Sequence, residues 1–396
     1  MSGYTGARPN LAWALGLTAD KTRLRVAIVG GGISALTVSA GLFASIPNLE
    51  LHLFEKRSEL CPLQQGCDSR WLHPRIYDWP VPGARAPNAS LPLLNWSEGR
   101  AADVARQIVR SFSSGIQQTS ADITVHARVE HLVINPKKRQ VEWIGRRTSG
   151  FSEYSARSRA VGGTMVFDVI VIAAGFGVEE GQGKWEANSY WRNEAIAQPA
   201  LDGMVHTFCI SGSGDGALVD LGRLALERFR QDKVLTELFG SDLHTVESSL
   251  ASALSDAMPR GALLTATQWF DLFSDLERSH LAGKVDLIRE RVRKDTRVVL
   301  HLAGREQKNS WMADAFRSNA SFMNRMLLYL LFRAGAFVPS FSSLEETVQR
   351  HSVLSDRVIC RHGTLVEAHR ARRRPNSSRT HHTAPLKPAA IGFSSV

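Results

Sequence analysis

The sequence contains few cysteines and no apolar run long enough to cross a membrane. Four cysteines occur in 396 residues, and their spacing matches neither a disulfide framework nor a zinc site. The longest apolar stretch, 326–338, is interrupted by Arg333 and is predicted to be a buried helix. The apolar segment 11–17 has no basic start and no small-residue cleavage site after it. We therefore expect a cytoplasmic protein with no metal and no membrane insertion.

Acidic residues are missing from the last part of the chain, where basic residues gather. The formal net charge is +10, and six of these charges lie between residues 368 and 396. They belong to Arg370, Arg372, Arg373, Arg374, Arg379 and Lys387. Because this stretch is also rich in serine, proline and histidine, we expect a disordered basic tail over 367–396. Nucleic acid is not an expected partner, since the rest of the chain is only mildly basic; contact of the tail with an anionic surface is the alternative.

The sequence does contain a strand–turn–helix–strand pattern over residues 25–55. Residues 26–29 form a short β-branched apolar run, which is typical of a buried parallel strand. The pattern then predicts a helix over 33–45 and a second strand over 49–54. The length of the chain and its hydrophobic content of 43% leave room for two domains.

Glycines at the turn of this pattern and an acid at its end indicate a dinucleotide site. Gly30, Gly32 and Ala35 fill the G-x-G-x-x-G/A pattern. Gly30 permits the tight turn and Gly32 lets a diphosphate approach the backbone, while the helix presents free N–H groups from its first residues, Ser34 among them. Glu55 stands where a carboxylate would accept both hydroxyls of an adenosine ribose. The structural alternative is a glycine turn that binds nothing.

The middle of the chain continues the α/β pattern. Apolar residues at helical spacing predict a packed helix over 95–112, with Ser97 as its N-cap. Two alternating stretches, 123–133 and 140–144, predict antiparallel strands around a turn. Residues 167–173 predict another buried strand, which ends in the sequence Ala-Gly-Phe-Gly.

This order of features resembles the FAD-binding flavoproteins with two dinucleotide-binding domains, such as pyridine-nucleotide disulfide reductases, thioredoxin reductase and flavin monooxygenases. Residues 168–175 (DVIVIAAG) resemble the ATG motif of that family, with Ala174 in place of the usual threonine. The resemblance implies an α/β Rossmann-type FAD-binding domain with three-layer ββα features over 24–203. It also implies an adenine contact at Val129 and places Gly175 near the pyrophosphate.

The loop after Glu55 is dense in proline, tryptophan and polar residues, so it is predicted to be long and ordered. In flavoproteins of the kind that this chain resembles, the chain passes over the pyrophosphate and isoalloxazine at this place. The resemblance therefore implies that Gln65, Arg70 and His73 are polar contacts of the cofactor.

Two cysteines in this loop bear on a dithiol mechanism. The disulfide reductases have four residues between their redox cysteines, whereas five separate Cys61 from Cys67. Pro62 also disfavours a helix between them. The C-x-x-C motif of thioredoxin reductase is absent. We therefore expect spectator thiols.

A second glycine pattern lies within residues 205–225, after an apolar strand and before a helix. Gly212, Gly214 and Ala217 again fit G-x-G-x-x-A, which predicts a site for NADPH or NADH. Alternatively, Asp215 resembles the aspartate of the late Gly-Asp motif of FAD domains, which holds the flavin ribityl chain. A purely structural turn is the third interpretation.

The rest of the chain is predicted to form a second nucleotide-binding-like unit over 204–366 with a helical insertion. Residues 220–294 are mostly helical in pattern, and 297–302 predict a delayed second strand. Arg305 could then meet a 2′-phosphate and favour NADPH over NADH; a solvated arginine is the alternative. Residues 1–23 are expected to form an irregular arm.

The resemblance implies an FAD-dependent oxidoreductase, in which NAD(P)H reduces the flavin and oxygen or a small organic acceptor reoxidises it, as in monooxygenases. His73, Asp78 and His301 are candidates for proton transfer. One alternative is an oxidase or dehydrogenase that takes hydride from a small substrate without NAD(P)H. Another is a non-catalytic dinucleotide-binding or sensing protein.

Overall fold

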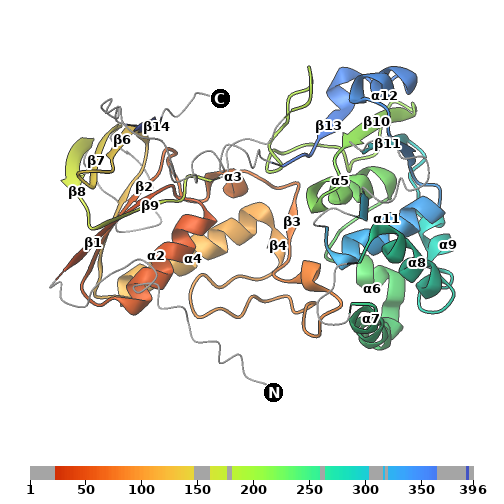
Figure 1. Cartoon of the computed structure of the whole chain (residues 1–396), viewed down its shortest axis with the longest axis horizontal. Helices are drawn as coiled ribbons and strands as arrows, with labels where there is room; N and C mark the ends of the chain where they lie inside the picture. Colours follow the sequence, from red (N-terminus) through yellow and green to blue (C-terminus); the bar gives the residue numbers. More distant parts are fainter. Residues whose placement is uncertain are drawn as a thin grey trace, which may run out of the picture.

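Two parallel β-sheets, one in each half of the chain, form the frame of the molecule. The computed structural model describes residues 23–146, 161–175, 181–258, 264–302, 315–316, 320–363 and 389–391. Figure 1 shows two lobes, the first built from the early strands and the second from the later strands and most of the helices. Within the described ranges no helix has the length and apolar character needed to cross a bilayer.

The first lobe contains four parallel strands in the order β5-β2-β1-β9. They are β1 (Leu24–Val29), β2 (Leu49–Phe54), β5 (Asp122–His126) and β9 (Val169–Ile172). One face of β1, with Val26 and Ile28, packs against helices α2 (Ile33–Ser45) and α4 (Ala101–Gln118). The other face, with Val29, packs against an antiparallel meander of β6 (Val129–Asn135), β7 (Gln140–Gly145) and β8 (Gly162–Val166). This three-layer arrangement confirms the predicted α/β class.

The second lobe repeats the strand order of the first. Its parallel sheet runs β12-β11-β10-β13. The strands are β10 (His206–Ser211), β11 (Thr296–His301), β12 (Val338–Ser340) and β13 (Val358–Cys360). In both sheets, the strand that comes first in sequence lies between the second and the fourth. Strand β11 pairs in parallel with β10, which confirms the prediction of a delayed second strand.

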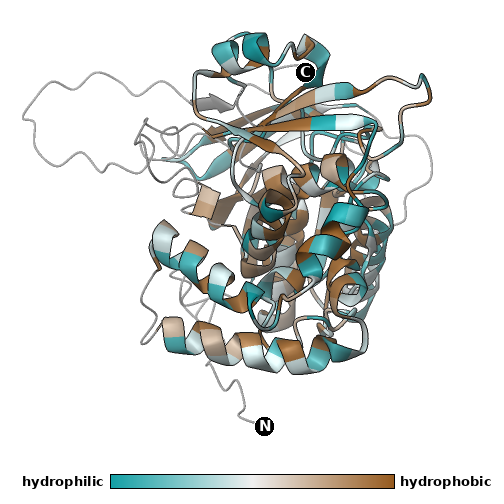
Figure 2. Cartoon of the chain, turned by 90° about the vertical axis from the view of Figure 1, so that its right-hand side faces the viewer, coloured by the Kyte–Doolittle hydropathy of each residue, from teal (hydrophilic) through white to brown (hydrophobic). Residues whose placement is uncertain are grey.

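Helices fill the interval between β10 and β11, as the sequence predicted. They are α5 (Asp215–Ala225), α6 (Val234–Phe239), α7 (Leu243–Ala257), α8 (Ala266–Glu277) and α9 (Lys284–Glu290), with the 3₁₀ turn η2 (Gly240–Asp242). Later in the chain come α11 (Phe322–Arg333), α12 (Leu344–Arg350) and η4 (Ser355–Arg357). In Figure 2, helices of this lobe alternate between hydrophilic and hydrophobic residues, as expected for helices that cover a core.

The loop between β2 and α4 joins the two lobes. It contains α3 (Pro62–Gln65), β3 (Trp71–Leu72), η1 (Ile76–Asp78) and β4 (Gly99–Arg100). Trp79, which is 1% exposed, packs in the core of the second lobe against Phe239 and Phe322, with ring centroids 6.2 and 5.7 Å away. This loop is therefore part of the packed structure of both lobes.

Two predictions about helices in this region are wrong. Helix α4 begins at Ala101 with Arg100 as its N-cap, because the residues before it have other partners. Ser97 binds Asn88 through its hydroxyl at 2.5 Å, and Gly99–Arg100 pairs with β3. Helix α3 begins at Pro62, since proline is tolerated in the first turn of a helix, where its missing N–H needs no partner.

Three residues of the predicted disordered tail form a strand. Strand β14 (Ala389–Ile391) pairs antiparallel with β6 and places Ala390 opposite Val133. These residues are uncharged and apolar, and the edge of β6 offers its backbone N–H and C=O groups to them. The other residues of the tail, the predicted arm before residue 23, and Arg305 lie outside the described residues.

Candidate functional site

The first glycine turn has a shape that suits the role predicted for each glycine. Gly30 has a φ of +116°, and a Cβ added there would lie 2.2 Å from the carbonyl oxygen of Ala173. Gly32 is the N-cap of α2 with a φ of −77°, and a Cβ added there would meet nothing within 4 Å. The fold therefore requires glycine at residue 30. Gly32 instead leaves open space in front of the helix N-terminus, where backbone N–H groups can bind a phosphate.

Glu55 follows β2 and binds the glycine turn directly. Its Oε2 accepts a hydrogen bond from the Gly31 N–H at 2.6 Å, and its Oε1 accepts one from the Arg57 N–H at 2.7 Å. The side chain is buried, and this burial raises its pKa above the ordinary value. The Lys56 backbone N–H binds this carboxylate as well. A carboxylate offers about four lone-pair sites, so about one is left for a ribose hydroxyl. The acid and the turn thus fit the sugar and diphosphate of an adenine dinucleotide.

Three more of the predicted cofactor contacts lie at this turn. Val129 donates its N–H to the carbonyl oxygen of Glu55 at 3.0 Å, so its backbone lies beside the acid. Ala174 and Gly175 follow β9, whose end reaches the turn through the carbonyl group of Ala173. Gly175 has a φ of +82°, a backbone conformation that favours glycine, and open space at its Cβ position.

The other residues of the first lobe that were predicted to contact the cofactor differ in burial and in their hydrogen-bond partners. Ala35 is fully buried on α2, whereas Ser34 is exposed beside it. Gln65 donates its side-chain N–H to the carbonyl oxygen of Leu60 at 2.6 Å, so it stabilises its own loop. Arg70 extends toward the second lobe and joins a buried ion-pair cluster, described below.

The second glycine turn has the geometry of the first. Gly212 has a φ of +135°, and a Cβ added there would lie 2.2 Å from the carbonyl oxygen of Arg361. Gly214 is the N-cap of α5 with a φ of −77°, and a Cβ added there would again meet nothing within 4 Å. The open space in front of a helix N-terminus is therefore present twice in this chain.

The acid of the first site has no counterpart in the second. In the first lobe, Gly30 donates its N–H to the carbonyl oxygen of Phe54 at 2.8 Å, and the residue after Phe54 is Glu55. In the second lobe, Gly212 donates its N–H to the carbonyl oxygen of His301 at 3.1 Å, and the next residue is Leu302. A leucine cannot accept hydrogen bonds from a ribose. The two turns therefore differ in what they offer to an adenosine.

The Asp215 side chain binds the start of helix α11. Its Oδ1 accepts hydrogen bonds from the Ser321 N–H at 2.8 Å, the Ser321 hydroxyl at 3.0 Å and the Asn324 side-chain amide at 2.6 Å. These contacts fasten the start of α11 to the start of α5. Ala217, two residues later on α5, is fully buried. Both residues thus have a packing role in the second lobe.

Two of the proton-transfer candidates lie in the loop between the lobes. His73 is buried, accepts a hydrogen bond from the Arg75 N–H at 3.2 Å, and lies 3.4 Å from Glu98. Burial lowers the pKa of this histidine. Asp78 is exposed and pairs with Arg75 at 3.0 Å.

The third candidate, His301, lies at the end of β11. Its Nδ1 is 2.7 Å from the Ser211 hydroxyl, and its Nε2 is 3.0 Å from the carbonyl oxygen of Ser342. Burial lowers its pKa as well. Since both ring nitrogens have partners within the second lobe, His301 links neighbouring strands there, far along the chain from His73 and Asp78.

Sequence reasoning missed a buried ion-pair cluster between the lobes. Asp220, which is fully buried on α5, binds Arg70 through both of its oxygens and lies 2.9 Å from Nε of Arg361 and 3.3 Å from Arg223. Glu194 pairs with Arg70 at 3.4 Å and also with Arg223. Burial alone would raise the pKa of Asp220, but the arginines, Arg70 foremost, hold it below the ordinary value.

A signal for this cluster was present in the sequence. Asp220 and Arg223 interrupt an otherwise apolar run, ALVDLGRLA, on a predicted helix. Charged residues on the buried side of a helix need partners, so such an interruption indicates a buried ion pair. The identity of the partner, Arg70, could not be read from the sequence because 150 residues separate it from Asp220.

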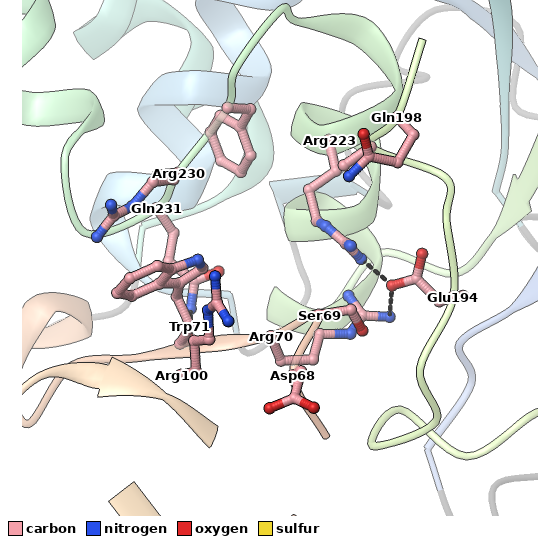
Figure 3. Close-up of a pocket in the computed structure, with 12 residues that line it drawn as sticks. Asp68, Ser69, Arg70, Trp71, Arg100, Glu194, Gln198, Arg223, Arg230 and Gln231 are labelled. Carbon is pink, nitrogen blue, oxygen red and sulfur yellow. Dashed lines mark hydrogen bonds and ion pairs between the residues drawn. The ribbon is translucent and has the colours of Figure 1, made fainter. Parts of the chain in front are cut away.

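A cavity of about 210 Å³ lies beside this cluster, at the junction of the lobes (Figure 3). Residues 68–71 and Arg100 line it from the first lobe, and Arg223 and residues 229–231 line it from the second. The Arg230 guanidinium stacks 3.4 Å from the centre of the Trp71 ring, and the Gln231 side chain donates to the Trp71 carbonyl oxygen at 2.6 Å. The cavity is therefore built by both halves of the chain.

The loop cysteines are in an environment that opposes dithiol chemistry. Cys61 and Cys67 are both free and buried. Burial raises the pKa of the Cys61 thiol to about 12, whereas the thiolate is the reactive form of cysteine. Among the described residues, no group of three or more His, Cys, Asp and Glu side chains could hold a metal ion.

Comparison with known proteins finds likeness only among solved structures. No protein family matches the sequence, and no curated protein matches it. A pyridine nucleotide-disulfide family oxidoreductase from Enterococcus faecalis is 12% identical with a TM-score of 0.27, over 51% of this chain and 34% of its own. A flavin monooxygenase from Stenotrophomonas maltophilia is 13% identical with a TM-score of 0.31, over 51% and 55%. Bacillithiol disulfide reductase from Staphylococcus aureus is 11% identical with a TM-score of 0.33, over 81% and 67%. This chain thus spans about a third of the length of the first of these structures.

Proposed function

We propose that the first glycine turn binds the ADP half of FAD and that the protein is an FAD-dependent oxidoreductase. The observation that carries this proposal is the pairing of open space at Gly32 with the carboxylate of Glu55. The helix N-terminus behind Gly32 favours a diphosphate, and the remaining acceptor site of the Glu55 carboxylate favours a ribose hydroxyl. A bound flavin supplies the hydride and electron transfer, while the protein binds and orients it.

Two groups of residues have distinct roles in this proposal. Gly32 and the first N–H groups of α2 hold the diphosphate, and Glu55 orients the ribose. Val129, Ala174 and Gly175 form the backbone walls around them. None of these groups needs to transfer a proton, so FAD binding at this turn does not involve His73, Asp78 or His301.

The second turn is proposed as the site where NADPH or NADH delivers hydride, as in monooxygenases. Its support is the open space at Gly214, which repeats that of Gly32. Leu302, in the position of the missing acid, instead favours the second candidate, an oxidase or dehydrogenase that takes hydride directly from its substrate.

A matched pair of variants tests the FAD site. Gly32→Val and Gly214→Val each add a side chain in open space at a φ of −77°, so both should fold. We expect Gly32→Val to abolish the quenching of FAD fluorescence on titration with purified protein, and Gly214→Val to leave it unchanged. Glu55→Gln should weaken FAD binding about tenfold, since a hydrogen bond to a charged group is lost. Equal FAD affinity in Gly32→Val and the parent protein would refute the assignment.

Stopped-flow reduction then separates the two candidate functions. If NADPH or NADH binds the second turn, either nucleotide bleaches the flavin faster than buffer does, and Gly214→Val slows the bleaching while FAD remains bound. If the flavin is reduced only by an organic substrate, neither nucleotide bleaches it and Gly214→Val has no effect.

A further inference from the structure

The cavity at the junction of the lobes has a wall of mixed polar and aromatic character (Figure 3). Trp71 and Arg100 are opposite one another in the β3–β4 pair, and both line the cavity. Ser69 lines it too, and its hydroxyl is buried without a hydrogen-bond partner. A buried hydroxyl without a partner costs free energy, and a ligand that accepts its proton removes that cost.

The positive charges around the cavity are not all compensated. Arg70 and Arg223 share Asp220 and Glu194, as described above. Arg230 binds Asp232 at 2.6 Å. In the part of the chain that the structure describes, no carboxylate pairs with Arg100.

The lining groups and their partners include five arginines and four carboxylates. The arginines are Arg70, Arg100, Arg223, Arg230 and Arg361, and the carboxylates are those of Asp68, Glu194, Asp220 and Asp232. In Figure 3 the carboxylate of Asp68 points away from the other labelled side chains. The carboxylates of Asp220 and Glu194 are shared among three of these arginines. Arg100 is exposed and has no carboxylate partner within the described ranges, so its guanidinium can bind a carboxylate through two parallel hydrogen bonds.

The volume sets the size of the ligand. A cavity of about 150 Å³ can hold benzene, and this one measures about 210 Å³. There is room for one ring and one small charged group. Phosphate has no apolar group that could lie against Trp71, so an anion with a ring suits this lining better than phosphate does.

We propose that this cavity binds a small organic monoanion, a carboxylate of about one ring in size. Arg100 supplies the charge, the Ser69 hydroxyl donates a hydrogen bond, and the side chain of Trp71 forms the apolar wall. Binding of the anion depends only on these residues. That the bound anion is the substrate of the flavin reaction is a further step, which rests on the function proposed above.

Isothermal titration calorimetry with sodium benzoate tests this site in the full chain. We expect saturable binding of benzoate, weaker binding of inorganic phosphate, and no heat with benzamide, which has the same ring without the charge. Arg100→Gln should weaken benzoate binding about tenfold, and Arg100→Lys should restore part of it, since lysine keeps the charge without the planar fork. Arg106→Gln removes an exposed arginine that pairs with Asp103 on the neighbouring helix α4 and does not line the cavity, so it should change nothing.

The outcomes for this site and for the FAD site can be told apart. Gly32→Val should lose FAD and keep benzoate, whereas Arg100→Gln should lose benzoate and keep FAD. If benzamide or phosphate binds as tightly as benzoate, or if Arg100→Gln and Arg106→Gln bind benzoate equally, the proposed anion site is wrong whatever happens to FAD.

Discussion

At the scale of single residues, a row of buried polar side chains crosses the face of the first sheet that meets the meander. Glu50 lies 3.1 Å from Nε2 of His52, and Nδ1 of His52 lies 3.0 Å from Nε2 of His126. The His126 ring also stacks on Phe54, with centroids 4.6 Å apart. Burial, and then the neighbouring His52, lower the pKa of His126 to about 4, and burial lowers the pKa of His52 as well.

This pair predicts that acid destabilises the first lobe. The folded pKa of His126 lies below the unfolded value, so the unfolded chain binds more protons as the pH falls below about 6.5. Stability is therefore complete above that pH and is lost progressively toward pH 4, by on the order of 3 kcal/mol for this group. Urea unfolding followed by tryptophan fluorescence at pH 7.5 and pH 4.5 measures the loss.

A substitution identifies the group responsible. His126→Phe keeps a ring in the stack with Phe54 and removes the titrating group, so its stability should depend less on pH over this range. His131→Phe, at an exposed position of β6, serves as the control and should keep the dependence of the parent protein. An unchanged dependence in His126→Phe would assign the acid sensitivity to other groups.

At the scale of elements, the two glycines of the first turn differ in kind. Gly30 is constrained twice, by its positive φ and by the carbonyl group of Ala173. Gly32 has an ordinary extended backbone and free space around it. One glycine is therefore needed for folding, whereas the other leaves open space for the ligand that we propose, although both belong to the same sequence pattern.

This difference predicts that substitution by alanine lowers stability at one glycine and has almost no effect on stability at the other. Gly30→Ala should lower the free energy of unfolding by about 3 kcal/mol, because a Cβ at positive φ is strained and would collide with a backbone oxygen. Gly32→Ala should leave stability within about 0.5 kcal/mol of the parent. Thermal unfolding of the two variants, compared in one buffer, measures the contrast; equal stabilities would contradict the geometry of the turn.

The first lobe could be predicted from sequence because its signals are local. The strands at residues 26–29 and 49–54, the turn between them and the acid at Glu55 all lie within about thirty residues, and periodicity and glycine spacing are local properties. The start of α4 could not be predicted from local signals. Ser97 has the chemistry of an N-cap, but its hydroxyl binds Asn88, and Arg100 lies in the strand that pairs with β3.

The second lobe was harder to predict because its arrangement depends on contacts between residues that are far apart in the sequence. Strand β11 follows β10 only after several helices, so its place in the sheet depends on long-range pairing. Its register with β10 decides that Leu302 occupies the position that Glu55 has in the first lobe, and no local pattern carries that information. The role of Arg70 likewise depends on a partner on α5, in the other lobe.

At the scale of the whole molecule, the long loop and the Asp220 cluster hold the lobes together. Trp79 brings the loop into the core of the second lobe, and Arg70 brings it to the buried carboxylate of Asp220. The proposed FAD turn lies in one lobe, and the anion cavity lies at the junction. Their relative position therefore depends on these fastenings.

Asp220→Asn tests whether the buried ion pair between Arg70 and Asp220 holds the lobes together. The substitution removes the charge that Arg70, Arg223 and Arg361 share, which should cost about 3–5 kcal/mol. Glu194 remains as a partner of Arg70 and Arg223. Because Arg70 belongs to the loop and Asp220 to α5, we expect the loss to loosen the junction: benzoate binding should weaken, while FAD binding in the first lobe should persist. Differential scanning calorimetry with both titrations measures these effects against Asp103→Asn, which breaks an exposed pair with Arg106 on α4. If Asp220→Asn proves as stable as Asp103→Asn, the cluster does not hold the lobes together; if it loses FAD and benzoate alike, the damage is not confined to the junction.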